Sequence, residues 1–280
     1  MTKLKNLKSI DLSSITIIGT SISFIWSIIF SIVIMAILSM IIGRFDISFA
    51  IIGIAIIFGT LIVSISKYFG VSFLYNFLIK RMKDVKLGID NMESIKSVSV
   101  VSLSIMVAVI SLIVSVIIYP IIFLAISFVT ILYSLLQAIS LQGFSWLVYP
   151  FGLAFDPTFI LYSFIIGLVF TAIGSFIFNK ISPKIGGLKV LLTQEDNMIS
   201  IDFISPKSAG IITGVICLVF GLIYGVIFSI ISVSLPANLL LIIFLTVGGL
   251  IGGFIYGSIS AYLYNFFSKK FSPVKIELKD

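Results

Sequence analysis

Long apolar stretches alternate with short polar ones along the whole chain. Each apolar stretch holds about 20 residues or more, enough for an α-helix to cross the hydrocarbon core of a bilayer. The pattern predicts six spanning helices, at residues 15–42, 47–67, 103–131, 158–178, 210–234 and 239–261. We therefore expect an integral membrane α-helical protein.

Short segments beside these stretches alternate apolar and polar residues, which is the period of a β-strand. They read VKLGI from Val85, LKVLL from Leu188 and VKIEL from Val274. Asp-Asn-Met follows at 90–92 and 196–198, and both Asn and Asp suit tight turns. We expect short cytoplasmic β-strands that form a small sheet capping the helices, with the last strand near the first.

Comparison of the chain with itself finds one unit three times. An asparagine preceded by an aromatic residue closes each unit's second apolar stretch, at Asn76, Asn179 and Asn265. A shared block opens each unit: KSIDLSS at 8–14, KSVSVVS at 96–102 and ISIDFIS at 199–205. Because internal repeats fix an architecture, we divide the chain into repeat 1 (1–90), repeat 2 (91–194) and repeat 3 (195–280), each with two spans.

Repeat 2 carries an insertion at 132–157, which contains Trp146, Tyr149, Pro150 and Pro157. Aromatic residues of this kind favour the membrane interface, and the alternatives are a re-entrant segment or a seventh span. A seventh span would put the later basic clusters across the membrane. With six spans each repeat enters and leaves on the same side, so we expect three tandem parallel hairpins in a pseudo-threefold arrangement rather than inverted repeats.

Composition and charge support this topology. The chain is 60% hydrophobic and 10% charged, whereas soluble domains carry roughly 25% charged residues. Six spans place sixteen of the 18 basic residues on one side, which the positive-inside rule makes cytoplasmic. They are Lys3, Lys5, Lys8, Lys80, Arg81, Lys83, Lys86, Lys96, Lys180, Lys184, Lys189, Lys207, Lys269, Lys270, Lys275 and Lys279. Both termini are therefore expected in the cytoplasm and the protein in the cell membrane.

Small residues recur every four positions before each asparagine, so they share one helix face. In lipid, such faces let helix backbones approach closely. We interpret the stripe as the packing face of each second helix; the alternative is the polar lining of a conduit. The stripe includes Thr60, Ser64, Ser163, Gly167, Gly249, Gly253 and Gly257.

The asparagines and the tyrosines before two of them, Tyr75 and Tyr264, are candidate structural or functional residues. An asparagine side chain can cap loosened carbonyls or bond a neighbouring helix, and tyrosine anchors at the interface. A binding site made of three convergent asparagines is the alternative. Lys67 is the one charge inside a predicted span. It either snorkels to water or serves as a functional cation.

Several kinds of chemistry have no residues to carry them. The chain has no histidine and one cysteine, Cys217, so the commonest general base and metal ligand are missing. We expect no enzyme activity, no cofactor and no metal. The basic rim lies at the membrane edges, which favours the headgroups of anionic membrane lipids over nucleic acid.

The pattern Ile-Asp-x-x-Ser, two spans, Leu-Tyr-Asn and a closing strand resembles a family of actinobacterial and archaeal transmembrane domains of unknown function. AYLYN at 261–265 and SFLYN at 72–76 carry the resemblance, whereas repeat 2 has FIFN but keeps a Gly186–Gly187 pair. Members usually have one such unit, so the chain resembles three tandem copies from an archaeal or bacterial source. The family has no established activity, and the resemblance implies a fold only.

These observations favour a non-enzymatic integral membrane scaffold or partner-binding subunit, which binds membrane lipids and other membrane proteins. The first alternative is a passive channel or small-solute facilitator along the pseudo-threefold axis, lined by residues such as Ser23, Ser27, Ser64 and Ser111. The second is a lipid-binding membrane protein that uses Lys67 and the basic rim.

Overall fold

A computed structural model describes the chain except for residues 1, 46, 119–157, 196, 232–234 and 280. It contains two compact units, one formed by residues 1–99 and 174–280 and the other by 100–173. In the described residues six helices are long and apolar enough to cross a membrane, which confirms the prediction of a multi-pass membrane protein. The insertion at 132–157, and with it the question of a seventh span, lies outside the described residues.

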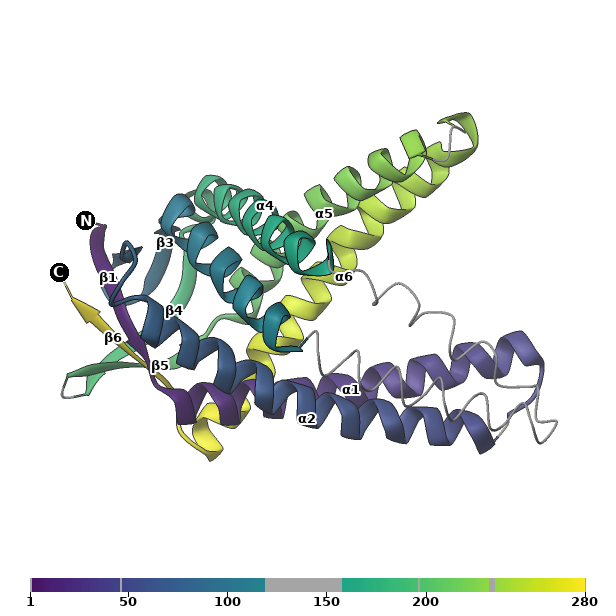
Figure 1. Cartoon of the computed structure of the whole chain (residues 1–280), viewed down its shortest axis with the longest axis horizontal. Coiled ribbons are helices and arrows are strands. Elements are labelled where there is room, and N and C mark those ends of the chain that lie inside the picture. Colours follow the sequence, from purple (N-terminus) through teal and green to yellow (C-terminus); the bar gives the residue numbers. More distant parts are fainter. Residues whose placement is uncertain (1, 46, 119–157, 196, 232–234, 280) are drawn as a thin grey trace. The chain divides into compact units, whose positions relative to one another are not determined.

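The first unit contains two pairs of long helices. Helix α1 packs along α2, and α5 packs along α6 (Figure 1). The second unit contains a helix at Val100–Ile118 and most of α4. The bounds are α1 Leu12–Ile42, α2 Ile47–Leu78, α4 Thr158–Ile181, α5 Pro206–Ile231 and α6 Leu235–Lys270.

The second helix of each repeat is longer than its predicted span, and here the predicted bounds are wrong. The span predicted at 47–67 is part of a helix that continues to Leu78, and the one at 239–261 continues to Lys270. Hydropathy marks where the apolar stretch ends, but a helix continues until its backbone meets a turn or proline. As a result Lys67 and all three asparagines lie within helices, not beyond them.

Six antiparallel strands of the first unit form one closed barrel, in the order β1-β2-β3-β4-β5-β6. The bounds are β1 Lys3–Ile10, β2 Val85–Asp90, β3 Ser94–Val98, β4 Leu188–Glu195, β5 Met198–Ile204 and β6 Val274–Lys279. β6 pairs with β1, so the expected pairing of the last strand with the first is confirmed. The sheet goes further than expected by closing, which leaves no free strand edge.

Each repeat supplies two neighbouring strands, and the seams between repeats share one irregularity. The register shifts once at each seam, in β2–β3, β4–β5 and β6–β1. The residues that these registers skip are Lys8, Lys96 and Asp202. Such β-bulges bend a strand and increase its twist, which helps a short sheet to close.

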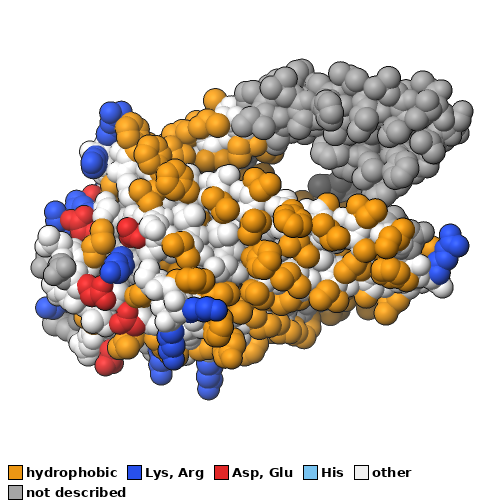
Figure 2. All heavy atoms as spheres, turned by 90° about the horizontal axis from the view of Figure 1, so that it is seen from below, with side chains coloured by type: hydrophobic (Ala, Val, Ile, Leu, Met, Phe, Trp, Pro, Cys, Tyr) orange, Lys and Arg blue, Asp and Glu red, His pale blue; other side chains and the backbone are white. Residues whose placement is uncertain are grey.

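Apolar side chains fill the barrel. The buried cluster includes Ile89 of β2, Val190 and Leu192 of β4, Ile199 of β5 and Ile276 of β6. Ile18 of α1 and Tyr264 of α6 join it from the helices below. Outside, charged side chains gather around the strands, whereas hydrophobic side chains cover the helices (Figure 2). The barrel therefore has its own core, distinct from the lipid-facing helix surface.

Candidate functional site

The three asparagines make the same contact in each repeat. Asn76 accepts from the backbone N–H of Ile10 and donates to its carbonyl, both at 2.8 Å. Asn179 does the same to Val98, and Asn265 to Ile204, again at 2.8 Å. Each asparagine thus binds both backbone groups of one residue where a strand passes into a helix. We call each such pair of bonds an asparagine clamp.

The aromatic residue before each asparagine supports the clamp in two repeats. The Tyr75 hydroxyl donates to the Leu7 carbonyl at 2.8 Å, and the Tyr264 hydroxyl donates to the Ile201 carbonyl. Repeat 2 has Phe178 here, which has no hydroxyl. The Ser182 hydroxyl instead donates to the equivalent carbonyl, that of Ile95, at 2.9 Å. The serine therefore replaces the missing phenol, which the sequence comparison did not reveal.

The seams between repeats also repeat their hydrogen bonds. The amides of Asp11, Ser99 and Ser205, which directly precede a first helix, donate at 2.9 Å to lysine carbonyls of the neighbouring closing strand. Those carbonyls belong to Lys275, Lys86 and Lys189. The same lysine amides donate back to the serine hydroxyls of Ser14, Ser99 and Ser208. The β6–β1 seam has no connecting turn, yet it carries the same bonds as the two hairpins.

These contacts correct the alignment of the opening blocks. The sequence comparison placed Ile201-Asp202 of repeat 3 opposite Ile10-Asp11 of repeat 1. The clamp instead pairs Ile204 with Asn265, as Ile10 pairs with Asn76, so the alignment was wrong by three residues. The signal that could have shown this is Ser205 before Pro206, because serine followed by proline is typical of a helix start.

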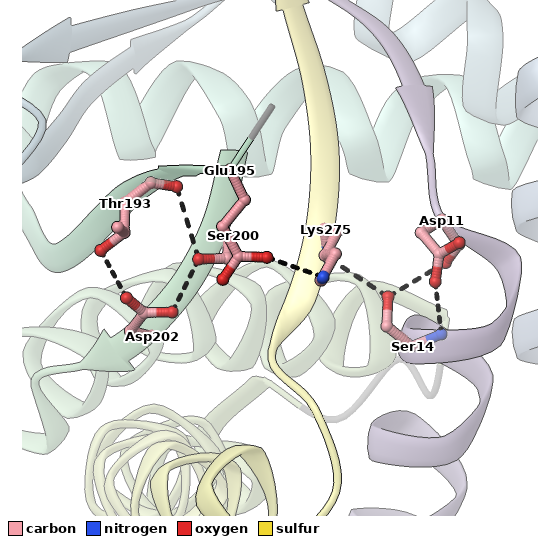
Figure 3. A network of polar contacts seen from close by, with 7 residues as sticks. All are labelled: Asp11, Ser14, Thr193, Glu195, Ser200, Asp202 and Lys275. Carbon is pink, nitrogen blue, oxygen red and sulfur yellow. Dashed lines mark hydrogen bonds and ion pairs between the residues drawn. The ribbon is translucent and has the colours of Figure 1, made fainter. Parts of the chain in front are cut away.

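A polar network crosses the outside of three strands and reaches the start of α1 (Figure 3). The Asp202 carboxylate accepts from the hydroxyls of Thr193 and Ser200 at 2.5 and 2.7 Å. Lys275 forms an ion pair with Glu195 at 2.7 Å. The Asp11 carboxylate caps α1 by accepting from the Ser14 amide at 2.7 Å. These contacts tie β4, β5, β6 and α1 together.

Carboxylates beside the barrel seams have lowered pKa values. The Lys96 ammonium hydrogen-bonded to Asp90 lowers the pKa of that carboxyl. The pKa of Glu277 is lowered by its bond to Lys279 and then by the one from Ser9 of β1. Both acids lie at seams, so their ionised forms favour the closed barrel.

Glu277 predicts an acid-sensitive β6–β1 seam. A lowered folded pKa means that the stabilisation is present above the ordinary value of 4.5 and is lost as pH falls through the folded value. Glu277→Gln should therefore lower the unfolding temperature slightly at pH 7, and the difference from the unmodified protein should shrink as the pH falls below 4.5. Thermal unfolding across this pH range measures it. Glu93→Gln, in an exposed turn, is the control, and an equal loss at every pH would contradict the prediction.

The small residues of repeat 3 face α5. A Cβ at Gly249 would lie 2.5 Å from the Cys217 carbonyl oxygen, and one at Gly253 would lie 2.9 Å from that of Thr213. A Cβ at Gly257 would lie 2.8 Å from the Ala209 carbonyl oxygen. Glycine is thus required where the two backbones meet. On α5, Gly210, Gly214, Gly221 and Gly225 likewise lie against α6.

The small residues of the other repeats are placed as follows. In the second unit, the Ser163 hydroxyl lies 2.8 Å from that of Ser115, and a Cβ at Gly167 would lie 3.3 Å from Cα of Ala108. In repeat 1, Thr60 and Ser64 line an open groove between α1 and α2 that ends at Lys67. The stripe therefore makes close contacts in repeats 2 and 3, whereas in repeat 1 part of it lines a groove.

Each of the three asparagines is engaged with its own strand. Among the described residues, no three acidic or cysteine side chains are grouped to hold a metal ion. The arrangement can therefore fix strands to helices. No family model, no curated protein and no solved structure matches the chain.

Proposed function

We propose that the protein is a non-enzymatic membrane scaffold or partner-binding subunit, built from three parallel helical hairpins around a pseudo-threefold axis. One observation carries the proposal: strands from all three repeats form a single closed barrel with a filled apolar interior. Such a barrel fixes the strands from which the helices start, and asparagine clamps join strand to helix. The clamp asparagines and the tyrosines beside them hold strands to helices.

The recurrence of clamps, seams and bulges supports equivalent repeats. The β6–β1 seam forms without a covalent turn, as a seam between separate chains would. This favours a fused trimer of the single-unit domains that the chain resembles. The basic residues around the strands support a cytoplasmic barrel by the positive-inside rule. Large exposed side chains on the helices, such as Leu240 and Phe244 of α6 at 79% and 72%, are available to lipid and to partner helices.

Isolation of the tagged full chain in mild detergent tests the scaffold function. We expect a second membrane protein to co-purify in fixed stoichiometry, as measured by the mass of the complex. Asn265→Asp, which weakens a clamp, should reduce the amount of partner while the chain still inserts in the membrane. Asn197→Asp, in an exposed turn, should retain it. Recovery of the chain alone from its native membrane would contradict the proposal.

The channel is the rival, and hydroxyl geometry weighs against it. Ser27 donates to the Phe24 carbonyl at 2.7 Å and Ser64 donates to that of Leu61 at 3.0 Å, each within its own helix. A filled barrel also offers no water path through its centre. Solute flux into vesicles should equal that of empty vesicles. Flux that both Ser64→Phe and Ser111→Phe abolish would favour the channel instead.

A further inference from the structure

The groove between α1 and α2 combines an apolar trough with one cation. It has a volume of about 420 Å³. Its lining includes Ser23 of α1 and Ala55, Gly59, Thr60 and Ser64 of α2, with Lys67 at the end nearer the barrel. A Cβ placed on Gly59 would meet no atom within 4 Å, so the groove is open at this glycine.

Helix length places Lys67 at a membrane boundary. α2 begins at Ile47, and 20 positions separate this residue from Lys67. At a rise of about 1.5 Å per residue these positions span about 30 Å, which is roughly the thickness of a hydrocarbon core. On α6, 21 positions separate the first residue, Leu235, from Tyr256, which gives about 31 Å. Lys67 and Tyr256 therefore each lie about one hydrocarbon thickness from the far end of their helix.

Aromatic residues at this level support the boundary. The Trp26 ring lies 4.9 Å from the Tyr256 ring, and its Nε1 donates to Ser260 at 3.0 Å. The Tyr68 hydroxyl lies 3.3 Å from that of Ser23. Tryptophan and tyrosine concentrate where hydrocarbon meets headgroups. The membrane boundary inferred from Lys67 on α2 therefore passes Trp26 on α1 and Tyr256 on α6.

Lys67 needs an anion that the described part of the chain does not supply. Its ammonium lies 5.2 Å from the centre of the Tyr68 ring, and no described carboxylate forms an ion pair with it. At a membrane boundary a lysine side chain extends its ammonium towards the headgroups. The ion pairs of the described lysines instead occur at the barrel, as with Lys8 and Asp84. The complementary charge is therefore expected from the membrane.

We infer that the groove binds one anionic lipid of the barrel-side leaflet, with its headgroup at Lys67 and an acyl chain along the small residues. The groove length fits a single chain, because the 12 positions from Ala55 to Lys67 span about 18 Å, close to half of the hydrocarbon core. Thr60 and Ser64 have small side chains and Gly59 has none, so this face of α2 leaves space for an acyl chain. This site does not depend on the scaffold function.

Photo-crosslinking with a defined lipid tests the site. The full chain is reconstituted in phosphatidylcholine vesicles that contain a trace of phosphatidylglycerol or phosphatidylcholine carrying a diazirine in one acyl chain. Labelled peptides are mapped by mass spectrometry. We expect the phosphatidylglycerol probe to label residues 55–67 at least about tenfold more than the phosphatidylcholine probe, the ratio for a difference of 1.4 kcal/mol.

Variants distinguish the contribution of the lipid headgroup to binding from that of the acyl chain. Lys67→Gln should remove the preference for phosphatidylglycerol, and Lys67→Arg should keep it; Lys80→Gln is the control outside the groove. Gly59→Leu should block labelling by both probes, because its side chain enters the groove. Gly70→Leu, on the same helix and equally open, should not.

Three results would overturn the inference. They are equal labelling by the two probes, a preference that survives Lys67→Gln, and no labelling at 55–67 in either vesicle. The last would mean that protein fills the groove. A melting temperature measured for each variant identifies any that misfolds, in which case the arginine variant and the two-probe comparison in the unmodified protein still decide.

Discussion

Asn265→Asp should loosen the joint between α6 and β5 at neutral pH and restore it in acid. The asparagine amide donates to the Ile204 carbonyl at 2.8 Å. An ionised carboxylate has no donor there, so two oxygens face each other. A protonated aspartic acid has an O–H in the place of the N–H and can make both bonds. The structure therefore favours the neutral form and raises the folded pKa of the introduced acid.

The sign of the pH effect follows from this shift. A group whose folded pKa is raised adds stability as pH falls, so the variant should approach the unmodified protein at acid pH. At pH 7 we expect a loss of about 1–3 kcal/mol, because a part-buried carbonyl is left without its donor. Hydrogen exchange of the peptide that contains Ile204 measures it, since opening of the joint exposes that amide.

Asn197→Asp is the control, because Asn197 is exposed in the turn between β4 and β5. Glu277 and Asp90 also change the stability of the unmodified protein with pH. Its hydrogen exchange is therefore measured at each pH and serves as the reference for the variant. If Asn265→Asp exchanges like the unmodified protein at pH 7, the clamp contributes nothing and the residue must be explained otherwise. Asn265→Ala, which loses both bonds, should be destabilised at every pH.

Gly249→Ala should separate α5 from α6, whereas Gly248→Ala should not. A Cβ on Gly249 would lie 2.5 Å from the carbonyl oxygen of Cys217 and 3.1 Å from its carbon. Both are backbone atoms, so one helix must move. Overpacking of this kind costs about 1–3 kcal/mol. Gly248 is the next residue, and a Cβ there would meet no atom within 4 Å. Alanine at Gly248 should stabilise the helix by about 0.5–1 kcal/mol.

Cys217 reports the result, because it is the only cysteine in the chain and lies at this contact. Its labelling by a thiol reagent should be about tenfold faster in Gly249→Ala if the contact loses 1.4 kcal/mol. Gly252→Ala, also in open space, is a second control. Equal labelling of the Gly248 and Gly249 variants would show that the glycine face does not hold the pair together in the membrane.

The parts of the fold that the sequence predicted are those with a local pattern. The alternation of apolar and polar residues that begins at Val85, Leu188 and Val274 located three strands. Successive side chains of a strand point to opposite faces of the sheet, so the pattern is visible in the sequence. The asparagines were found by recurrence, but their partners were not. Asn76 binds Ile10 across 66 positions and Asn179 binds Val98 across 81, and no local period reports contacts at that distance.

The internal repeats also gave a wrong alignment where two similar short sequences could be matched. Ile201-Asp202 matches Ile10-Asp11 by letter, but Asp202 is skipped at a bulge and is therefore the structural equivalent of Lys8, which is skipped at the bulge in repeat 1. The replacement of a tyrosine hydroxyl by Ser182 was hidden for the same reason, because the serine lies one helical turn beyond the asparagine and reaches the same carbonyl. Backbone geometry, not residue identity, decides which groups meet.

The sequence by itself determined that lipid is the main solvent, that six stretches can cross it, and that short strands accompany them. These follow from how much apolar surface each stretch carries and from its period. Only the tertiary structure decided that the strands close into a barrel, that each asparagine holds one strand end, and that the small-residue face opens into a groove in repeat 1. Those outcomes depend on hydrogen bonds and backbone contacts between distant segments, which exist only after the chain has folded.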